Sequence, residues 1–313
     1  MYDTINFNLT ADDVRGVDFL NEIPCYLDTD GLGYHSYNGL SVVTGNLNGL
    51  RVSVSRWQVK VKDGSLCKYF LGDNYQTLGR GDTQRAIEKL SDGLHLPMGR
   101  AKITRMDVAH NIILKHPVSV YLGHLGLLRY ATRLVEPNGL YYTLKNGRLC
   151  FYDKNKEQRT KGDPIPELYA GRNLLRYELR YTHRLQAQFG VMDVTGALLY
   201  DEAFYMDVAK RWLGYYKDIA KINDITLNFQ AMKSKKDFYK MGLLSLTERM
   251  GGEVEMYNHI NEAQKRGELT SKQAFDIRQA VRESCKVKDG LTIPNEAIEE
   301  LDRKIREAAR YYR

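Results

Sequence analysis

The sequence of 313 residues lacks long apolar runs. No segment approaches the length of about 18 consecutive apolar residues that a transmembrane helix requires. The N-terminal segment MYDTINFNLTADD is polar and acidic, without the basic start and apolar core of a secretory signal peptide. These absences argue against a membrane-spanning or exported protein, and we expect the chain to act in the cytoplasm.

Cysteine is also scarce. The four cysteines, at positions 25, 67, 150 and 285, are far apart, and neither a CxxC pair nor a zinc-type spacing is present. We interpret them as reduced, mostly buried thiols. The sequence also contains no low-complexity tract and no internal repeat.

Basic residues, by contrast, exceed acidic ones. Lys and Arg number 46 and Asp and Glu 39, so the formal net charge is +7. Ten basic and five acidic residues fall between positions 140 and 190, and this window carries most of the excess. A modest basic excess suits a nucleic-acid partner but does not prove one.

Up to about residue 200 the pattern is that of a mixed α+β domain. Alternating apolar and polar residues predict hairpins early in the chain, with a slip near Arg56 interpreted as a bulge or bend. Helices are predicted at 81–94, with Asp82 as the cap, and at 117–133, and a polar loop at 155–172. The predicted strands cover 39–72, 100–115, 139–144, 147–154 and 173–183.

After about residue 200 the apolar residues recur at helical spacing. One of these helices opens with a capping box formed by Thr270 and Gln273. We therefore predict an α+β domain with an antiparallel sheet at 1–200 and a helical region at 201–313. The predicted helices are 201–221, 234–251, 269–286 and 295–312.

Three of the predicted strands each place charged groups on one face. Asp107 and Glu178 lie on two of them, and Tyr152 and Lys154 occupy alternate positions at the end of the third. Burying a charged sheet face away from water costs free energy. Such a face is expected where it binds a divalent cation and a phosphodiester. The two carboxylates are hard ligands suited to Mg²⁺ or Mn²⁺, and Lys154 would hold the phosphate charge.

Tyr152 is the candidate nucleophile of this arrangement. A free phenol has a pKa of about 10 and needs a base, a cation or a metal-polarised substrate to react at neutral pH. Its attack on phosphorus would give a phosphotyrosine ester and a free 3′-hydroxyl. Because that ester keeps the energy of the phosphodiester, the break could be resealed without ATP.

Four segments in order resemble the motifs of rolling-circle replication initiators. The chain is similar to the filamentous-phage gene II and CRI replication proteins and to the related Rep_trans plasmid initiators. The resemblance covers roughly residues 65 to 185. It is carried by KYFLGDNYQTLG, ITRMDVAHNI, RLCFYDKNKEQ and LLRYELRY.

The resemblance implies that Tyr152 is the nicking tyrosine and that Asp107 is a metal ligand or active-site acid. Glu178 and Lys154 would share the site, and Glu157 is a third candidate metal ligand. The chain departs from the plasmid group at His110, where that group often has a second acid, and it lacks a His-hydrophobe-His triplet. The departure leaves the complete metal shell open.

Structural interpretations compete with each of these roles. Tyr152 is one of 22 tyrosines and could be a packed edge residue. Asp107 could pair with Arg105, and Glu178 could belong to a surface ion-pair ladder with its arginine neighbours.

Three functions are consistent with these sequence features. The first is a nickase and strand transferase that starts rolling-circle replication of a phage or mobile element. It would bind double-stranded origin DNA and cut a single-stranded nick site, with the C-terminal helices serving origin recognition, homodimer contacts or host-helicase recruitment. The second is a non-catalytic DNA-binding regulator of the same fold, and the third is a relaxase for conjugative mobilisation.

Overall fold

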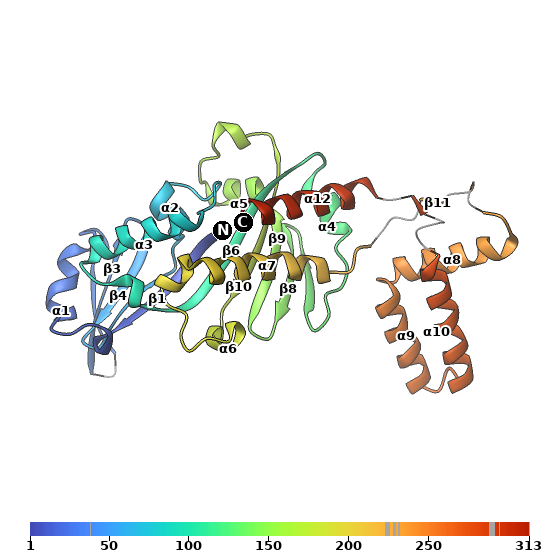
Figure 1. The fold of residues 1–313 in the computed structure, drawn as a ribbon, viewed down its shortest axis with the longest axis horizontal. Helices are drawn as coiled ribbons and strands as arrows, with labels where there is room; N and C mark the ends of the chain where they lie inside the picture. The colour runs from blue at the N-terminus through green and yellow to red at the C-terminus, as the bar shows by residue number, and fades with distance from the viewer. Residues whose placement is uncertain are drawn as a thin grey trace.

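The computed structural model of the protein describes residues 1–37, 39–222, 226–227, 230, 232–287, 292–293 and 295–312. Its main feature is a ten-stranded antiparallel sheet that forms the long axis of the body (Figure 1). The order is β2-β3-β4-β5-β1-β6-β10-β9-β8-β7, so the predicted α+β class with an antiparallel sheet is confirmed. The strands are β1 (Tyr2–Thr10), β2 (Gly33–Tyr37), β3 (Leu40–Leu47), β4 (Leu50–Ser55), β5 (Gln58–Lys62), β6 (Lys102–Leu114), β7 (Thr132–Glu136), β8 (Gly139–Leu144), β9 (Gly147–Asp153) and β10 (Asn173–Tyr181).

Tight turns set the register of the early hairpins. Asn48 and Gly49 join β3 to β4 with φ of 48° and 85°, which is the backbone that a two-residue turn between right-twisted strands needs. β4 and β5 meet where Ser55 pairs with Gln58. The slip predicted near Arg56 as a bulge or bend in one strand is therefore a hairpin turn between two strands.

The central strands separate an apolar face from a charged one. Val108 of β6 and Tyr177 of β10 are buried on the apolar face. α7 (Glu202–Asp218) and α12 (Glu296–Tyr311) cross this face in front of the strands in Figure 1. The ring of Tyr177 stacks on Trp212 of α7 at 4.6 Å between centroids. The opposite face of β6 and β10 carries buried charged residues, among them Asp107 and Glu178, which line a pocket.

The helix predicted at 117–133 is much shorter in the structure. α4 spans Val118–Gly123, and β7 already begins at Thr132. Gly126 supplies the reason, because its N–H donates to the carbonyl of Ala220 at 2.8 Å. A Cβ at this glycine would lie 2.9 Å from that oxygen. The chain here pairs closely with the segment after α7 and cannot continue as a helix.

The prediction of a polar loop at 155–172 is wrong over the first half of this range. Residues Lys154–Lys161 form α5. Asp153 caps the helix by accepting a hydrogen bond from the backbone N–H of Lys156 at 2.9 Å. Gly162 ends it in the left-handed conformation, with φ of 72°. Lys154 therefore begins a helix instead of extending β9.

The remaining helices of the body are short, apart from α3. That helix confirms the prediction at 81–94, although Gly79 is the N-cap and Asp82, three residues on, accepts its N–H at 3.0 Å. The helices are α1 (Phe19–Glu22), α2 (Leu66–Leu71), α3 (Arg80–Leu94) and α6 (Leu185–Phe189). The 3₁₀ turns are η1 (Ala11–Asp13), η2 (Ile23–Tyr26), η3 (Met98–Arg100), η4 (Glu167–Tyr169) and η5 (Ala197–Tyr200).

Among the described residues between α7 and α12, three helices form a separate lobe, which we call the helical lobe (Figure 1). Its own small core is distinct from the core of the sheet. The capping box of Thr270 and Gln273 is confirmed, whereas α9 was not predicted. The helices are α8 (Lys235–Arg249), α9 (Glu253–Lys265) and α10 (Ser271–Lys286), and the buried core residues are Met256, Ile260, Ala274 and Val281.

The core of the sheet includes side chains from both sides of residue 200. Val208 and Trp212 of α7 and Leu301 and Ile305 of α12 belong to it. The division predicted at residue 200 stays a prediction. A short strand pair, β11 (Thr226–Leu227) with β12 (Thr292–Ile293), links the two connections to the helical lobe.

Candidate active site

The charged face of β6, β9 and β10 forms the floor of a pocket of about 730 Å³. Glu178 lies at its centre, opposite Ala109 of β6 and Cys150 of β9. Both neighbours have small side chains, and the Glu178 carboxylate is instead enclosed by Tyr152, Arg176 and Arg180. Tyr152 and Asp107 line the same pocket from the flanking rows of the sheet.

Tyr152 and Glu178 are in direct contact. The Tyr152 hydroxyl donates to Oε2 of Glu178 at 3.2 Å. Burial, followed by the negative charge of Glu178, raises the pKa of Tyr152 well above that of a free phenol. Although burial opposes ionisation of Glu178, Arg176 and Arg180 outweigh it and hold the pKa of this carboxyl below its usual value. The pair is thus a protonated phenol against an ionised carboxylate.

Asp107 lies beside this pair in a bidentate contact with an arginine. Arg105 donates from Nε to Oδ1 at 2.9 Å and from Nη2 to Oδ2 at 2.6 Å, and Arg180 Nε lies 3.8 Å from Oδ2. Burial raises the pKa of Asp107 to about 7, because the Arg105 hydrogen bonds only partly offset it and Glu178 adds a like charge. Asp107 therefore pairs with Arg105, as expected if its role were purely structural.

Arg176 forms the buried base of the site, and Asp3 is its partner. The Arg176 guanidinium, only 1% exposed, donates to a carboxylate oxygen of Asp3, to the carbonyl of Asn74 and to the amide oxygen of Asn111. Its Nε lies 3.6 Å from Glu178 Oε2. Burial opposes the charge on Asp3, but Arg176 and a hydrogen bond from Ser65 keep its pKa below the usual value.

Sequence reasoning missed Asp3 for a physical reason. Strict alternation along β1 places Asp3 on the same face as Ile5 and Phe7, which are core residues. The structure has a register shift between Tyr2 and Ile5 against β6, and this irregularity turns Asp3 toward the pocket. In the sequence, the only indication of this role was that Asp3 is a charged residue at a position where alternation along β1 expects an apolar one.

Lys154 and Glu157 reach the pocket from α5. Lys154 is 1% exposed, and burial, reinforced by the charge of Arg176, lowers the pKa of its ammonium. Its Nζ donates to Glu157 Oε2 at 2.9 Å, and Glu157 also pairs with Lys161. Glu157 thus neutralises two lysines, and its predicted role as a metal ligand stays a prediction.

Asp107 and Glu178 supply the hard oxygen donors that a divalent cation takes, and both already pair with arginines. Six of the residues that line the pocket are acidic and five are basic. Glu178 is ionised, and Asp107 carries an unfavourable charge that a cation would stabilise. Within the described part of the chain, no group of three or more His, Cys, Asp or Glu side chains is placed to hold a metal. Two carboxylates suffice for Mg²⁺, which keeps several waters and takes further oxygens from a phosphate.

His110 lies on the face of β6 opposite Asp107, as strand alternation requires for residues three apart. Its Nδ1 is 2.6 Å from the hydroxyl of Tyr312, and its ring meets Trp212 edge-on. Burial lowers the pKa of His110 to about 3, so the ring is neutral. These contacts give it a packing role away from the pocket.

The Phage_CRI family, described as the N-terminal region of a replication-associated gene II protein, matches residues 1–212. The chain belongs to this family. The resemblance to the filamentous-phage gene II initiators is confirmed. The matched range contains all ten strands of the large sheet and every residue that lines the pocket, and it ends inside α7.

The helical lobe and α12 of this Phage_CRI protein lie beyond the matched range. No curated protein matches the chain. Over the residues that the structure describes, none of the helices has the length and apolar character needed to cross a membrane.

Proposed function

We propose that this replication-associated protein is a tyrosine nickase and strand transferase that acts at a rolling-circle origin. The contact between the Tyr152 hydroxyl and Glu178, at 3.2 Å in a charged pocket, is the observation that supports it most directly. A phenol at the rim of a sheet, held by a carboxylate and surrounded by cations, has the groups that phosphoryl transfer to tyrosine requires.

Tyr152 Oη attacks the scissile phosphorus while its proton passes to the Glu178 carboxylate that already accepts its hydrogen bond. The Oη–P bond forms as the bond from phosphorus to the 3′-oxygen breaks. The 3′-oxygen leaves with the electron pair and takes a proton from water. The products are a 5′-phosphotyrosine and a 3′-hydroxyl, and the reverse reaction joins the hydroxyl of another strand end.

Cationic side chains around the pocket bind the phosphodiester. Lys154, Arg105 and Arg180 all line it, and the carboxylates that pair with them hold their side chains in place. Asp107 and Glu178 would hold Mg²⁺ or Mn²⁺. Such a cation would supply polarisation of the phosphate and stabilisation of the transition-state charge.

The first experiment tests covalent attachment. Purified protein is incubated with Mn²⁺ and a labelled single-stranded oligonucleotide of its origin, and adducts are resolved on a denaturing gel. We expect an adduct with the unmodified protein and none with Tyr152→Phe, because the substitution removes only the attacking oxygen. Tyr141→Phe is the matched control, since Tyr141 lines the same pocket and the Arg148 guanidinium lies over its ring.

The non-catalytic regulator is the alternative that this experiment separates. The ion pairs of Asp107 with Arg105 and of Glu178 with Arg180 would also suit a site that only binds DNA. Binding of the oligonucleotide without an adduct in Mg²⁺, Mn²⁺ and other divalent metals would favour the regulator. A mobilisation relaxase would give the same adduct, and only a coupling-protein partner would distinguish it.

A further inference from the structure

The face of the sheet that forms the pocket continues past it, across β1, β5, β4 and β3. Asn6 of β1 lies opposite Arg105, which lines the pocket, and Asn8 lies opposite Lys60 of β5. On the other face of these strands, core residues such as Val52 pack under α3, which lies over the left-hand end of the sheet in Figure 1. The residues that share the pocket's side on β3, β4 and β5 are all exposed or half-buried. A second stretch of solvent-facing sheet surface thus adjoins the proposed nicking pocket.

Three cations gather on this surface. Arg51 of β4 lies directly opposite Lys62 of β5, and Lys60 is the next residue of β5 on the same side. The spacing of a sheet puts their positions within about 7 Å along the strands and about 5 Å across them. The cross-strand neighbours of Lys60, which are Ser53 and Asn8, carry no charge. We call Arg51, Lys60 and Lys62 the basic patch.

The basic patch lacks acidic partners among the residues that the structure describes. Lys102, a cation on the same side of β6, pairs with Asp193 at 3.1 Å, whereas none of the three patch residues forms an ion pair within the described ranges. Like charges directly opposite each other on neighbouring strands are destabilising. The facing pair of Arg51 and Lys62 therefore costs folding stability that no paired carboxylate offsets. Such a cluster indicates that a polyanion is its partner.

The basic patch is continuous with the pocket. Lys62 is followed directly by Asp63, and Arg51 comes two residues after Gly49. Both Asp63 and Gly49 line the pocket. A polyanion with one segment in the pocket can therefore place its next segment on the basic patch.

The side chains around the basic patch favour double-stranded over single-stranded DNA. Sites for single strands stack the bases on aromatic rings. On this side of β4, β5 and β1, the described residues beside the patch are Ser, Asn, Thr and Gln, and none is aromatic. Hydroxyl and amide groups together with Lys and Arg are the donors that contact the phosphates and sugars of a duplex. Because a duplex carries one negative charge per about 1.7 Å of its axis, several phosphates fall within the width of the patch.

We propose that the basic patch binds the sugar–phosphate backbone of the duplex that flanks the single-stranded nick site. The patch would hold the paired part of the origin while the pocket acts on the melted strand. This inference rests on the proposed nicking function for the strand in the pocket, but the contact itself requires no chemistry. It can therefore be measured separately.

The test compares binding of the full-length protein to two kinds of DNA. One is the single-stranded nick-site oligonucleotide, and the other is the same strand with a duplex arm of unrelated sequence on its 5′ or its 3′ side. Binding is followed by fluorescence anisotropy at several salt concentrations, without divalent metal so that no strand is cut. The variant combines Arg51→Thr, Lys60→Thr and Lys62→Thr, because threonine removes the charge and suits a strand.

We expect one of the duplex arms to tighten binding by the unmodified protein, and the triple variant to lose this gain. Loss of three phosphate contacts lowers the slope of log K against log salt by roughly 2 to 3. Between about 50 and 200 mM salt, the affinity of the variant for the armed DNA should therefore fall roughly 40-fold less than that of the unmodified protein. The matched control is Arg80→Ala with Arg85→Ala and Lys89→Ala, which removes three cations from α3 on the other side of the sheet and should keep the gain.

The stability of the free variant separates binding from a structural role. Because Arg51 and Lys62 repel each other, the triple variant should unfold at a denaturant concentration no lower than that of the unmodified protein. If the triple variant does not fold, Lys60→Thr alone is measured, and the slope for the armed DNA should fall by roughly 0.9.

The outcomes distinguish this inference from the proposed function. A gain from the duplex arm that persists in the variant overturns the inference, and so does an equal gain from a single-stranded arm of the same length. Absence of any gain with the unmodified protein also overturns it. None of these results affects the adduct at Tyr152. Conversely, absence of the adduct overturns the nickase, and a duplex gain that depends on the basic patch would still support the DNA contact.

Discussion

At the scale of single residues, His110 links pH to stability. Its folded pKa of about 3 lies below the ordinary value of about 6.5, so the unfolded chain binds a proton in this interval and the folded chain does not. The stabilisation is complete above about pH 6.5 and declines as the pH falls toward 3. Between pH 6.5 and 5 the loss from this residue should reach up to about 2 kcal/mol.

Denaturant unfolding of the protein and of His110→Gln, measured across this pH range, checks the prediction. Glutamine can still pair with the Tyr312 hydroxyl but does not titrate, so acid should destabilise the variant less than the unmodified protein. Parallel pH profiles for the two proteins would show that His110 is not the source of the pH dependence.

At the scale of elements, α5 shows why a helix at the site escaped prediction. Its residues KNKEQRTK form no apolar stripe, so hydrophobic periodicity could not predict a helix there. Only the Asp153 cap and Gly162 marked the ends of the helix. The strands beside it were predicted correctly because alternation on β6 and β10 separates core residues from charged ones. Local pattern thus placed Asp107, Tyr152 and Glu178 on one face, whereas Asp3 and Asn74 reach the pocket through a register shift and a loop.

The cap of α5 is itself testable. Asp153→Ala removes the acceptor for the Lys156 N–H and should lower the free energy of unfolding by about 1 kcal/mol. Because α5 begins with the buried Lys154, fraying its first turn should also slow adduct formation. Asp153→Asn keeps a capping oxygen and should retain both properties. Equal adduct rates in the two variants would show that the cap does not position Lys154.

At the scale of the whole molecule, contacts between distant segments decide the architecture. Periodicity predicted the helices α7 and α12 but could not show that they return to the sheet on either side of the helical lobe. Tyr312, for example, meets His110 across 202 positions of sequence. A contact between residues so far apart in the sequence cannot be predicted from local pattern. For the same reason, the sequence did not show that the core of the helical lobe is separate from the core of the sheet.

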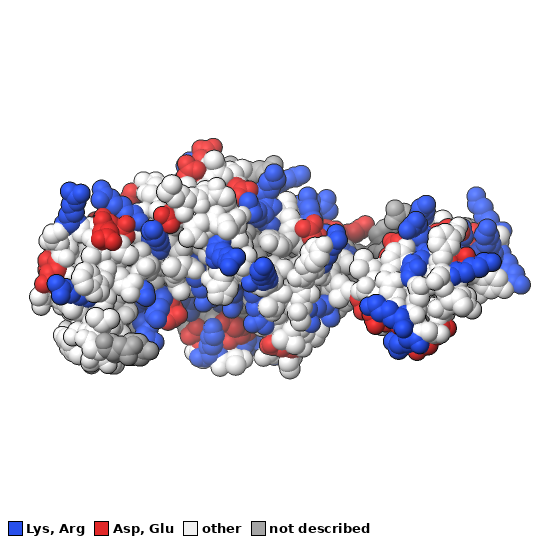
Figure 2. Space-filling view, turned by 90° about the horizontal axis from the view of Figure 1, so that it is seen from below, with Lys and Arg blue, Asp and Glu red and all other residues white. Residues whose placement is uncertain are grey.

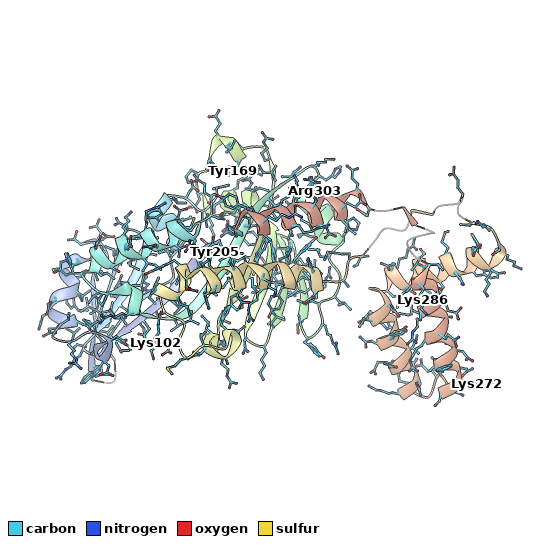
Figure 3. All side chains as sticks on the ribbon, viewed as in Figure 1. Lys102, Tyr169, Tyr205, Lys272, Lys286 and Arg303 are labelled. Carbon is cyan, nitrogen blue, oxygen red and sulfur yellow. The ribbon has the colours of Figure 1, made fainter. Side chains whose placement is uncertain are left out.

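If the helical lobe contacts DNA, α8 is the surface whose side chains suit that contact. Basic side chains lie among acidic and uncharged ones at the right-hand end of Figure 2, and Lys272 and Lys286 lie near the two ends of α10 in Figure 3. On α8, Lys235, Lys236 and Lys240 accompany Phe238 and Tyr239, which are 54% and 60% exposed. Cations beside exposed rings suit a phosphate backbone with accessible bases.

If α8 contacts phosphates, replacing its three lysines with alanine should weaken binding to origin DNA and flatten its salt dependence. Each phosphate contact contributes about 0.7 to 0.9 to the slope of log K against log salt, so the slope should fall by roughly 2 to 3. Fluorescence anisotropy at several salt concentrations measures it. Lys265→Ala with Arg266→Ala is the control, because these cations pair with Glu262 and Glu268 on α9 and beyond. An unchanged slope in the α8 variant would place the DNA contacts on the sheet domain and leave the lobe for protein partners.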